Sequence, residues 1–346
     1  MKDYIIVGCG LAGISFAETA YQNNKMFTVI ADEYQNSSRV AAGIYNPVIV
    51  KRLSMPANAA EHMQYIRPFY KQVEERLKVK VDYAIPLYRR FTSIEEQNDW
   101  FTAADKPGLG AFLSTTIKYK LYPCLSSPYG FGAVLHTGYV DTVTLIDSYR
   151  MFLKKSKLLI EEPFNHDALE IEEDHVSYKG ITARHIIFAE GYGIHNNPFF
   201  KHLPLAGTKG ELLLIRAPEL KLDVAVNAGI FILPVGNDHY KVGATYEWTD
   251  KTSIPTEAAK KELLEKLEEI ITCSYEVIDH YAGIRPTTKD RKPLIGTHPD
   301  YRRVHLLNGL GTRGVMLGPP MAKQLYDAVE NGAAIDPAVN LTRFKV

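Results

Sequence analysis

The feature that most constrains this chain is residues 3–32, which have the pattern of one strand–turn–helix–strand unit. A short apolar run at residues 4–7 leads directly into the glycine-rich turn GCGLAG at residues 8–13. A helical stretch, a second apolar run at residues 27–31 and an acidic residue, Asp32, follow. Such a turn presents free backbone N–H groups and the positive end of a helix to a pyrophosphate. The unit therefore predicts a dinucleotide-binding βαβ fold.

Each glycine of this turn has its own task in a dinucleotide site. Gly8 allows the tight turn, Gly10 removes the side chain that would block the phosphates, and Gly13 lets helix and strand pack closely. Asp32 follows at about 20 residues, where a carboxylate accepts hydrogen bonds from both ribose hydroxyls of an adenosine. We expect the cofactor to be bound here by Gly8, Gly10, Leu11, Ala12, Gly13 and Asp32. These residues alone do not distinguish NAD from FAD, because both cofactors use this pattern.

Composition and charge exclude several classes of protein. The chain has 346 residues, enough for one large domain or two ordinary ones. No run reaches the roughly 18 apolar residues of a membrane-spanning helix, and the first residues lack the pattern of a leader, so we expect a cytoplasmic protein without a membrane span. The 40 Lys and Arg residues balance 40 Asp and Glu, which argues against a dedicated nucleic-acid binder. The three cysteines and 11 histidines show no metal-binding spacing, so we expect no metal site.

Hydrophobic periodicity predicts the remaining elements. Helical patterns cover residues 57–78, with a kink or restart at Pro68, and residues 256–271, where leucines and isoleucines face inward; Asp141 has the features of an N-cap for a further helix. Residues 79–140 have a strand-like pattern with aromatics and turns. Further strands are expected at residues 185–189, 211–216, 229–234, 240–246 and 304–310, and a final helix should end near Asn331.

The order of these elements predicts an α/β protein with two interleaved domains. The first unit and the last strand–glycine–helix segment both fit one parallel sheet, and long antiparallel segments lie between them. We expect a discontinuous Rossmann-like nucleotide domain and a mostly antiparallel-sheet substrate domain. The predicted nucleotide domain comprises residues 1–56, 137–205 and 280–346; the predicted substrate domain comprises residues 57–136 and 206–279.

Two internal segments have small residues where a flat ligand could approach the backbone. Residues 38–47 contain Ala41, Ala42 and Gly43, although an ordinary loop of small residues would have the same composition. Residues 187–193 form a buried strand that ends in Ala189, Glu190 and Gly191. At the carboxyl end of a parallel strand this places backbone beside a cofactor, and a plain exit from the strand is the alternative.

Two segments near the end of the chain carry candidate arginines. Arg285 stands between an isoleucine and a proline in GIRPTTKDRKPLIG, and its planar fork could bind a substrate carboxylate through two hydrogen bonds. An internal ion pair, for instance with Asp290, is the alternative. The turn GLGTRG at residues 309–314 opens the last helix, whose positive end should face the ring of the cofactor. Gly311 and Gly314 would lie there, and Arg313 is a second candidate cation, unless it is simply exposed.

In this order and spacing the segments resemble the glycine oxidase and D-amino-acid oxidase-like family of FAD-dependent oxidoreductases. The most specific part is AGIRPTTKDRKPLIGTHPD at residues 282–300; supporting landmarks are GYVD at 138–141, LAGTKGE at 205–211 and GAT at 243–245. The resemblance implies FAD as cofactor and Arg285 as the residue that holds the substrate carboxylate, with Arg313 assisting. It implies oxidation of a small amine or amino acid by hydride transfer to the flavin, with dioxygen or another acceptor taking the electrons.

The chain departs from the family pattern at three places. Phe231 stands where glycine oxidases have a tyrosine that helps to bind the carboxylate. Arg313 is one residue away from the glycine oxidase position, and GLGTRG is closer to the oxidative domain of a bifunctional tRNA-modifying enzyme. No cysteine follows Cys273, whereas sarcosine-type relatives attach FAD through a late cysteine, so non-covalent FAD is expected. A tRNA wobble-uridine side-chain oxidase and a flavin-binding protein without amine oxidase activity remain as alternatives.

Overall fold

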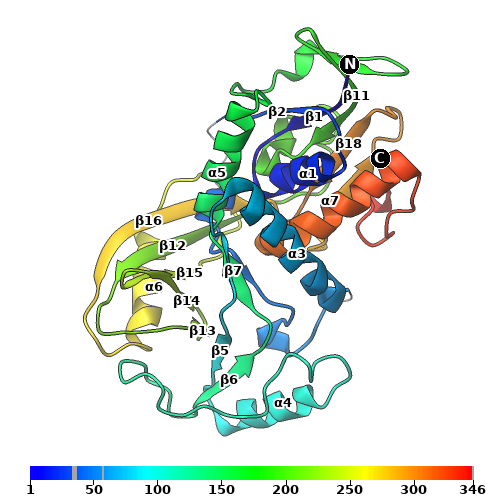
Figure 1. Ribbon diagram of the computed structural model, residues 1–346. Coiled ribbons are helices and arrows are strands. Elements are labelled where there is room, and N and C mark those ends of the chain that lie inside the picture. The colour runs from blue at the N-terminus through cyan, green and yellow to red at the C-terminus, as the bar shows by residue number, and fades with distance from the viewer. Residues whose placement is uncertain (33–36, 57, 345–346) are drawn as a thin grey trace.

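The computed structural model describes residues 1–32, 37–56 and 58–344. Its first sheet has the strand order β17-β18-β11-β1-β2-β8 (Figure 1), and β1, β2, β8, β11 and β18 run parallel. The central strand β1 therefore lies between β2, which follows it closely in the sequence, and β11, which comes much later. The bounds are β1 Lys2–Val7, β2 Phe27–Ile30, β8 Leu159–Ile160, β11 Ile181–Phe188, β17 Leu294–Thr297 and β18 Val304–Asn308, with β9 Leu169–Ile171 and β10 Val176–Tyr178 as an antiparallel extension.

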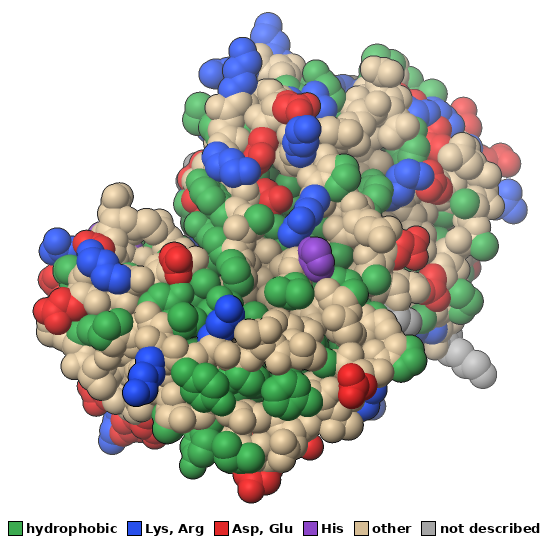
Figure 2. Space-filling model, turned by 60° about the horizontal axis from the view of Figure 1, so that its bottom comes forward, with side chains coloured by type: hydrophobic (Ala, Val, Ile, Leu, Met, Phe, Trp, Pro, Cys, Tyr) green, Lys and Arg blue, Asp and Glu red, His purple; other side chains and the backbone are tan. Residues whose placement is uncertain are grey.

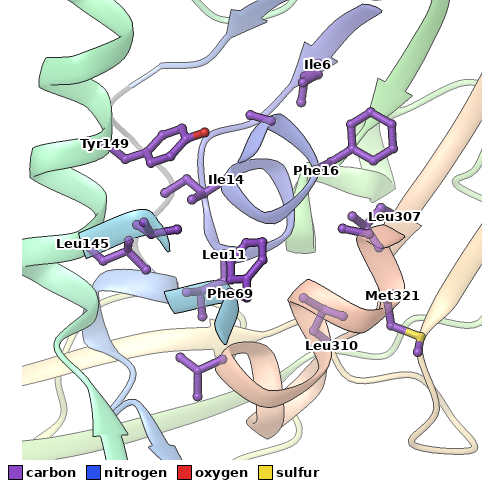
Figure 3. Packing of buried hydrophobic residues seen from close by; sticks show 14 of the residues in the cluster. Ile6, Leu11, Ile14, Phe16, Phe69, Leu145, Tyr149, Leu307, Leu310 and Met321 are labelled. Atoms are coloured by element: carbon purple, nitrogen blue, oxygen red, sulfur yellow. The ribbon is translucent and has the colours of Figure 1, made fainter. Parts of the chain in front are cut away.

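Helix α1 lies at the centre of the packing beside this sheet. It contacts α7, although the two helices come from opposite ends of the sequence (Figure 1). Figure 3 shows Leu11, Ile14 and Phe16 of α1 pointing outward in different directions among side chains from the surrounding elements. All three are buried, so α1 is fixed on several sides and holds the turn before it in place. The helices here are α1 Leu11–Gln22, α3 Ala59–Leu77, α5 Thr142–Lys155 and α7 Gly314–Asn331, with α2 Ser37–Val40 beside them.

The second sheet contains the strands predicted at residues 211–216, 229–234 and 240–246. The order is β16-β12-β15-β14-β13-β5-β6, and β16, β12, β15, β14 and β13 pair antiparallel in that order. Helix α6, Glu257–Glu268, buries Leu263 and Leu267 in the same hydrophobic cluster as this sheet. The bounds are β5 Leu87–Arg90, β6 Phe131–Val134, β12 Thr208–Arg216, β13 Ala225–Asn227, β14 Phe231–Gly236, β15 His239–Gly243 and β16 Glu276–Arg285. A small third sheet joins β3 Ile44–Tyr45, β4 Asp82–Tyr83 and β7 Gly138–Val140.

One prediction about local structure was wrong, and one was wrong in part. Residues 79–140 contain the helix α4, Ile94–Ala104, which forms because Ser93 caps it by accepting from the N–H of Glu96 and because Trp100 is fully buried on its inner face. Helix α3 continues through Pro68, so the predicted restart does not occur, whereas the alternative of a kink remains a prediction. Burial of Ile66, Phe69 and Tyr70 around the proline keeps this helix intact despite the lost hydrogen bond. The N-cap at Asp141 is confirmed by its bond to the N–H of Thr144, at 3.1 Å.

The α/β class with one parallel and one mostly antiparallel sheet is confirmed, whereas the domain boundaries remain a prediction. Helix α3 lies inside the predicted substrate segment, yet its buried face packs against α7 in the cluster around α1. Strand β16 crosses the predicted boundary at residue 280 and pairs along its whole length with β12. Short 3-10 turns complete the chain: η1 Val50–Arg52, η2 His166–Ala168, η3 Gly191–Asn196, η4 Gly311–Arg313 and η5 Leu341–Arg343.

A pair of buried histidines on the neighbouring strands β11 and β18 predicts a loss of stability in acid. Nδ1 of His185 lies 3.0 Å from Nε2 of His305, and burial lowers the pKa of His185 to about 4 and that of His305 well below its usual value. In the unfolded chain His185 binds a proton near pH 6.5, whereas in the folded chain it does so only near pH 4. The stability that depends on its neutral imidazole is therefore fully present above pH 6.5 and is lost as the pH falls from 6.5 to about 4.

We expect His185 to account for about 3 kcal/mol of the free energy of unfolding that is lost on acidification from neutral pH to about pH 4. His185→Gln removes this titration and should flatten the dependence of the urea midpoint on pH. An equally steep dependence in the variant would show that other groups cause it.

Candidate functional site

Two adjoining cavities lie at the carboxyl ends of the parallel strands. The larger, about 810 Å³, is lined by Gly8, Asp32 and Glu190, and the smaller, about 320 Å³, lies between the two main sheets. Gly8 lines the larger cavity and Gly10, two residues later, lines the smaller one. Glu190 and Ala189 likewise line the larger and the smaller cavity, so the two cavities adjoin at these two turns. The smaller cavity collects the other predicted residues: Gly10, Leu11, Ala12, Ala41, Ala42, Gly43, Ala189, Gly191, Arg285, Gly311, Arg313 and Gly314. Gly13 lines neither.

The glycines of the first turn are required by close packing of the backbone. Gly8 has φ +102°, and a Cβ atom there would lie 2.5 Å from the carbonyl oxygen of Ala189. A Cβ atom at Gly13 would lie 2.0 Å from the carbonyl oxygen of Gly8, so Gly13 holds strand and helix together as predicted. Gly10 is the N-cap of α1, and a Cβ atom there would approach only the hydroxyl of Ser38, at 2.9 Å. That hydroxyl accepts the N–H of Leu11 at 3.1 Å.

The larger cavity has a rim of charged side chains that the sequence analysis did not identify. Asp32 ends the segment after β2, and its carbonyl oxygen accepts a hydrogen bond from Nη1 of Arg150 at 3.2 Å. Arg150 also pairs with Glu161 at 2.8 Å, and Arg39 pairs with Asp147. These residues have no motif of their own; they come together because α5 and the segment after it pass over the end of β2.

Glu190 belongs to the cofactor cavity, but its carboxylate is already occupied. One of its oxygens is 2.9 Å from Nε2 of His166, and the other accepts from Nδ2 of Asn197 at 2.6 Å. The side chain is buried and therefore fixes η3, which begins at Gly191. Backbone around Ala189 and Gly191, rather than this carboxylate, is left to face a ligand.

Arg285 lies at the last residue of β16 and reaches across β12 into the smaller cavity. Its Nη1 donates to the carbonyl oxygens of Thr245, at 3.2 Å, and Lys209, at 3.4 Å. The expected alternative, an ion pair with Asp290, is wrong, because Asp290 pairs with Arg343 at 2.8 Å. In the described part of the chain no carboxylate pairs with Arg285. Burial lowers the pKa of its guanidinium from the ordinary value, so an anion entering the cavity would be bound strongly.

Gly210 makes room for this guanidinium. A Cβ atom at Gly210 would lie 1.9 Å from Nη2 of Arg285 and 2.1 Å from its Cζ. If Arg285 binds a substrate carboxylate beside FAD, as the resemblance implies, Gly210→Ala should displace this arginine and lower kcat/KM by about 100-fold while FAD stays bound. Steady-state kinetics and the visible flavin spectrum of the purified variant measure the two effects. Kinetics like those of the unaltered enzyme would show that the arginine does not need its present position.

Arg313 enters the same cavity from η4, directly before α7. Its guanidinium is half-buried rather than fully exposed, and burial lowers its pKa, while the phenol of Tyr246 opposes that shift. Tyr246 is the residue that the sequence analysis missed. It follows the GAT segment, its ring centre lies 4.6 Å from Cζ of Arg285, and it is 62% exposed at the mouth of the cavity. Its position directly after a landmark of the resemblance was the available signal.

The wall of the smaller cavity between these charges is mainly apolar. Phe231, Leu212 and Ala244 line it from the antiparallel sheet, and Met316 and Val315 line it from α7. Phe231 is therefore part of the site, at the place where the resemblance led us to expect a tyrosine. Among the described residues no helix is long and apolar enough to cross a membrane, and no three His, Cys, Asp or Glu side chains are grouped as a metal site.

Comparisons with curated proteins give relatives of known activity. The chain is 26% identical to glycine oxidase of Bacillus subtilis over 221 residues, which is 59% of each protein, and 26% identical to glycine oxidase of Pseudomonas putida over 366 residues, which is 97% of each. It is also 26% identical to the tRNA 5-methylaminomethyl-2-thiouridine biosynthesis bifunctional protein of Legionella pneumophila over 183 residues, spanning 27% of that protein.

The fold and the family agree with these relatives. A glycine oxidase structure from Geobacillus kaustophilus superimposes with a TM-score of 0.83 at 22% identity, covering all of this chain and 99% of that one. The family described as FAD dependent oxidoreductase (DAO) matches residues 3–328, nearly the whole chain. The two adjoining cavities fit the extended cofactor of that family. The chain belongs to the DAO family of FAD-dependent oxidoreductases, and its cofactor is FAD.

Proposed function

We propose that this enzyme oxidises a small amine that carries a carboxylate, as glycine oxidases do. The observation that carries the proposal is Arg285: a desolvated guanidinium without an acidic partner in the described chain, held by two backbone carbonyls in the smaller cavity. Such a group is the natural partner of a carboxylate, which its free edge binds through two parallel hydrogen bonds.

The residues that would hold FAD divide between the two cavities. The turn from Gly8 to Gly13 and the start of α1 would bind the pyrophosphate, and Asp32 the adenosine ribose. Ala41 to Gly43, Gly191 and the turn from Gly311 to Gly314 would surround the ring system in the smaller cavity. When bound, FAD supplies a two-electron acceptor, so that the C–N bond of the amine becomes an imine, which water then hydrolyses.

The side chains of the cavity would prepare the amine for this reaction. Arg285 fixes the carboxylate and therefore the position of the adjacent carbon. Phe231, Leu212 and Ala244 exclude water around the nitrogen. Desolvation favours the neutral amine, the form with an available electron pair. The mechanism needs no general base, and we assign none.

Anaerobic reduction tests the proposed function. The purified holoenzyme is mixed without oxygen with a panel of amino acids and N-substituted glycines, and the visible flavin absorbance is recorded. We expect bleaching by at least one carboxylate-bearing amine and none by the corresponding amines without a carboxylate. A flavin that no amine reduces would favour the alternative of a flavin-binding protein without amine oxidase activity. Oxygen uptake after bleaching then shows whether dioxygen is the acceptor.

A tRNA side-chain oxidase is the second candidate, favoured by the GLGTRG turn and the match to the bifunctional tRNA enzyme. The charge of the chain argues against it: the formal net charge is zero, and the face in Figure 2 shows acidic and basic side chains interspersed without a broad basic area. Bleaching by an RNA that carries a carboxymethylaminomethyl group, lost as salt is raised, would support this candidate over the small-amine proposal.

We also propose that FAD is bound without a covalent bond. None of the three cysteines lines the smaller cavity: Cys124 and Cys273 lie beside the antiparallel sheet, and Cys9 lines the larger cavity. Burial raises the pKa of Cys9 to about 12, so its thiol is not ionised at neutral pH. We expect acid precipitation to release the yellow colour entirely into the supernatant. Colour that stays with the precipitated protein would contradict this.

A further inference from the structure

Two guanidinium groups face the smaller cavity, and neither has an acidic partner in the described chain. Arg285 reaches the cavity from the antiparallel sheet and Arg313 from the start of α7. Several other half-buried arginines pair with carboxylates: Arg76 with Glu18 at 2.9 Å, Arg89 with Glu96 at 2.7 Å and Arg150 with Glu161 at 2.8 Å. Arg90 and Arg303 instead donate to backbone carbonyls, and neither lines this cavity. The cavity therefore holds two positive charges that the described chain leaves uncompensated.

The acidic residue that lines this cavity, Glu211, does not balance these charges. Its carboxylate lies 3.3 Å from Nζ of Lys209 and 3.0 Å from Nε2 of His280. It also accepts hydrogen bonds from the N–H and the hydroxyl of Thr256, at 2.8 and 3.0 Å. Glu211 is buried, and both of its carboxylate oxygens already have partners. Its negative charge is therefore balanced by Lys209 and not by the two arginines.

The ring of Tyr246 lies over the guanidinium of Arg285, with its centre 4.6 Å from Cζ. Its backbone is fixed against β12, because the N–H of Thr245 donates to the carbonyl oxygen of Glu211 and the N–H of Glu247 to that of Lys209. Its side chain raises the pKa of both guanidinium groups, against the lowering by burial. A neutral phenol offers no full negative charge, however, so the need for an anion remains.

The hydrogen-bonding capacity of the two arginines indicates more than one anionic group. Nη1 of Arg285 is occupied by the carbonyl oxygens of Thr245 and Lys209. Its remaining edge matches one carboxylate, which would then be satisfied. The guanidinium of Arg313 forms no hydrogen bond or ion pair within the described residues, so its full set of donors is left for a second group.

We propose that the substrate is an amine bearing two carboxylates, one bound by Arg285 and one by Arg313. This rests on the proposed function and names its substrate class. Both N-(carboxymethyl) amino acids and amino acids with an acidic side chain have this chemistry. Each carboxylate neutralises one half-buried guanidinium, so a dianionic substrate compensates both positive charges, whereas a monoanionic one leaves one guanidinium without a counter-charge.

Matched substrate pairs test the proposal on the holoenzyme. In the first arm of the comparison, iminodiacetate is tested against sarcosine, which places the second carboxylate on the nitrogen substituent. In the second arm, each enantiomer of aspartate is tested against the same enantiomer of alanine, which places it on the side chain. We expect kcat/KM to favour a dicarboxylate by about 100-fold in one arm. Arg313→Gln should lower kcat/KM for the dicarboxylate far more than for the monocarboxylate and so remove most of this preference, whereas Arg285→Gln should lower both to a similar extent. The exposed Arg302→Gln controls for the change in net charge.

Two results would overturn the proposal. Equal kcat/KM for mono- and dicarboxylates in both arms would show that one carboxylate suffices. An equal loss for both substrates in Arg313→Gln would show that the two arginines hold the same carboxylate. If Arg313→Gln fails to retain FAD, the ratio of kcat/KM for dicarboxylates to that for monocarboxylates in the unaltered enzyme decides whether the proposal stands.

A binding measurement separates this proposal from the proposed function. Succinate and propionate, which carry no amine, are titrated into the holoenzyme, and the shift in the visible flavin spectrum gives each Kd. Tighter binding of succinate, lost in Arg313→Gln, supports the two-anion site even if no amine reduces the flavin. Equal affinity for the two acids contradicts it even if amine oxidation is found.

Discussion

Replacing Arg285 with leucine should lower kcat/KM for the best amine substrate by about 1000-fold while the protein keeps its FAD. The loss is expected because Arg285 is the proposed partner of the substrate carboxylate: two backbone carbonyls and the ring of Tyr246 orient its guanidinium, and Gly210 makes space beneath it. Most of the effect should appear as a raised KM, since the carboxylate is bound before and during the reaction. Steady-state kinetics and the flavin-to-protein absorbance ratio measure the two parts.

A conservative change sharpens this prediction. Arg285→Lys keeps a positive charge but loses the planar fork, so we expect it to recover only part of the affinity. Arg343→Leu is the matched control, because that arginine pairs with Asp290 outside the two cavities. If the kinetics of Arg285→Leu match those of the control, Arg285 does not bind the substrate carboxylate.

Replacing Gly10 with valine should abolish FAD binding without unfolding the chain. Gly10 caps α1 and lines the cavity where the phosphates would approach, so a branched side chain there would occupy the space of the ligand. Within the protein a Cβ atom would meet only the Ser38 hydroxyl, at 2.9 Å, and a serine side chain can turn away. We expect a colourless protein with an unchanged far-UV circular dichroism spectrum.

A double substitution separates the two contacts. Gly10→Ala alone adds one methyl group against both the ligand and Ser38, and Gly10→Ala with Ser38→Ala removes the contact within the protein. A loss of FAD affinity that persists in the double variant is due to the ligand itself. If the double variant instead binds FAD as tightly as Ser38→Ala alone, the predicted approach of the phosphates to Gly10 is wrong.

The cofactor half of the site could be predicted because its residues are local in sequence. Gly8, Gly13 and Asp32 fall within one βαβ unit, whose spacing is fixed by backbone geometry, and the structure places Gly8 and Asp32 in one cavity and Gly13 at the strand–helix contact. Arg285 was recognised through a resemblance. Only the fold shows that it does not pair with Asp290, because Arg343, 53 residues after Asp290 in the sequence, binds that carboxylate.

The remaining parts depend on contacts between distant segments. Nothing local marks Tyr246 as a neighbour of Arg285, because β12 lies between the two segments and pairs with both. Helix α4 was missed because its buried face is short and lies among aromatic residues that also favour strands, so the cap at Ser93 was the only clear helical signal. The rim formed by Arg39, Arg150 and their partners likewise arises from the path of α5 over β2.

The interleaved sheet has a consequence for how the enzyme is made. Strand β1 is synthesised first, but its neighbour β11 begins only at Ile181, and β18, next to β11, begins at Val304. Strand β2 follows at once, but at translation speeds of about 5–20 residues per second β1 waits on the order of ten seconds or longer for β11 on its other side. Nascent chains should thus emerge with one uncovered apolar edge on β1, which stays exposed until β11 has been synthesised.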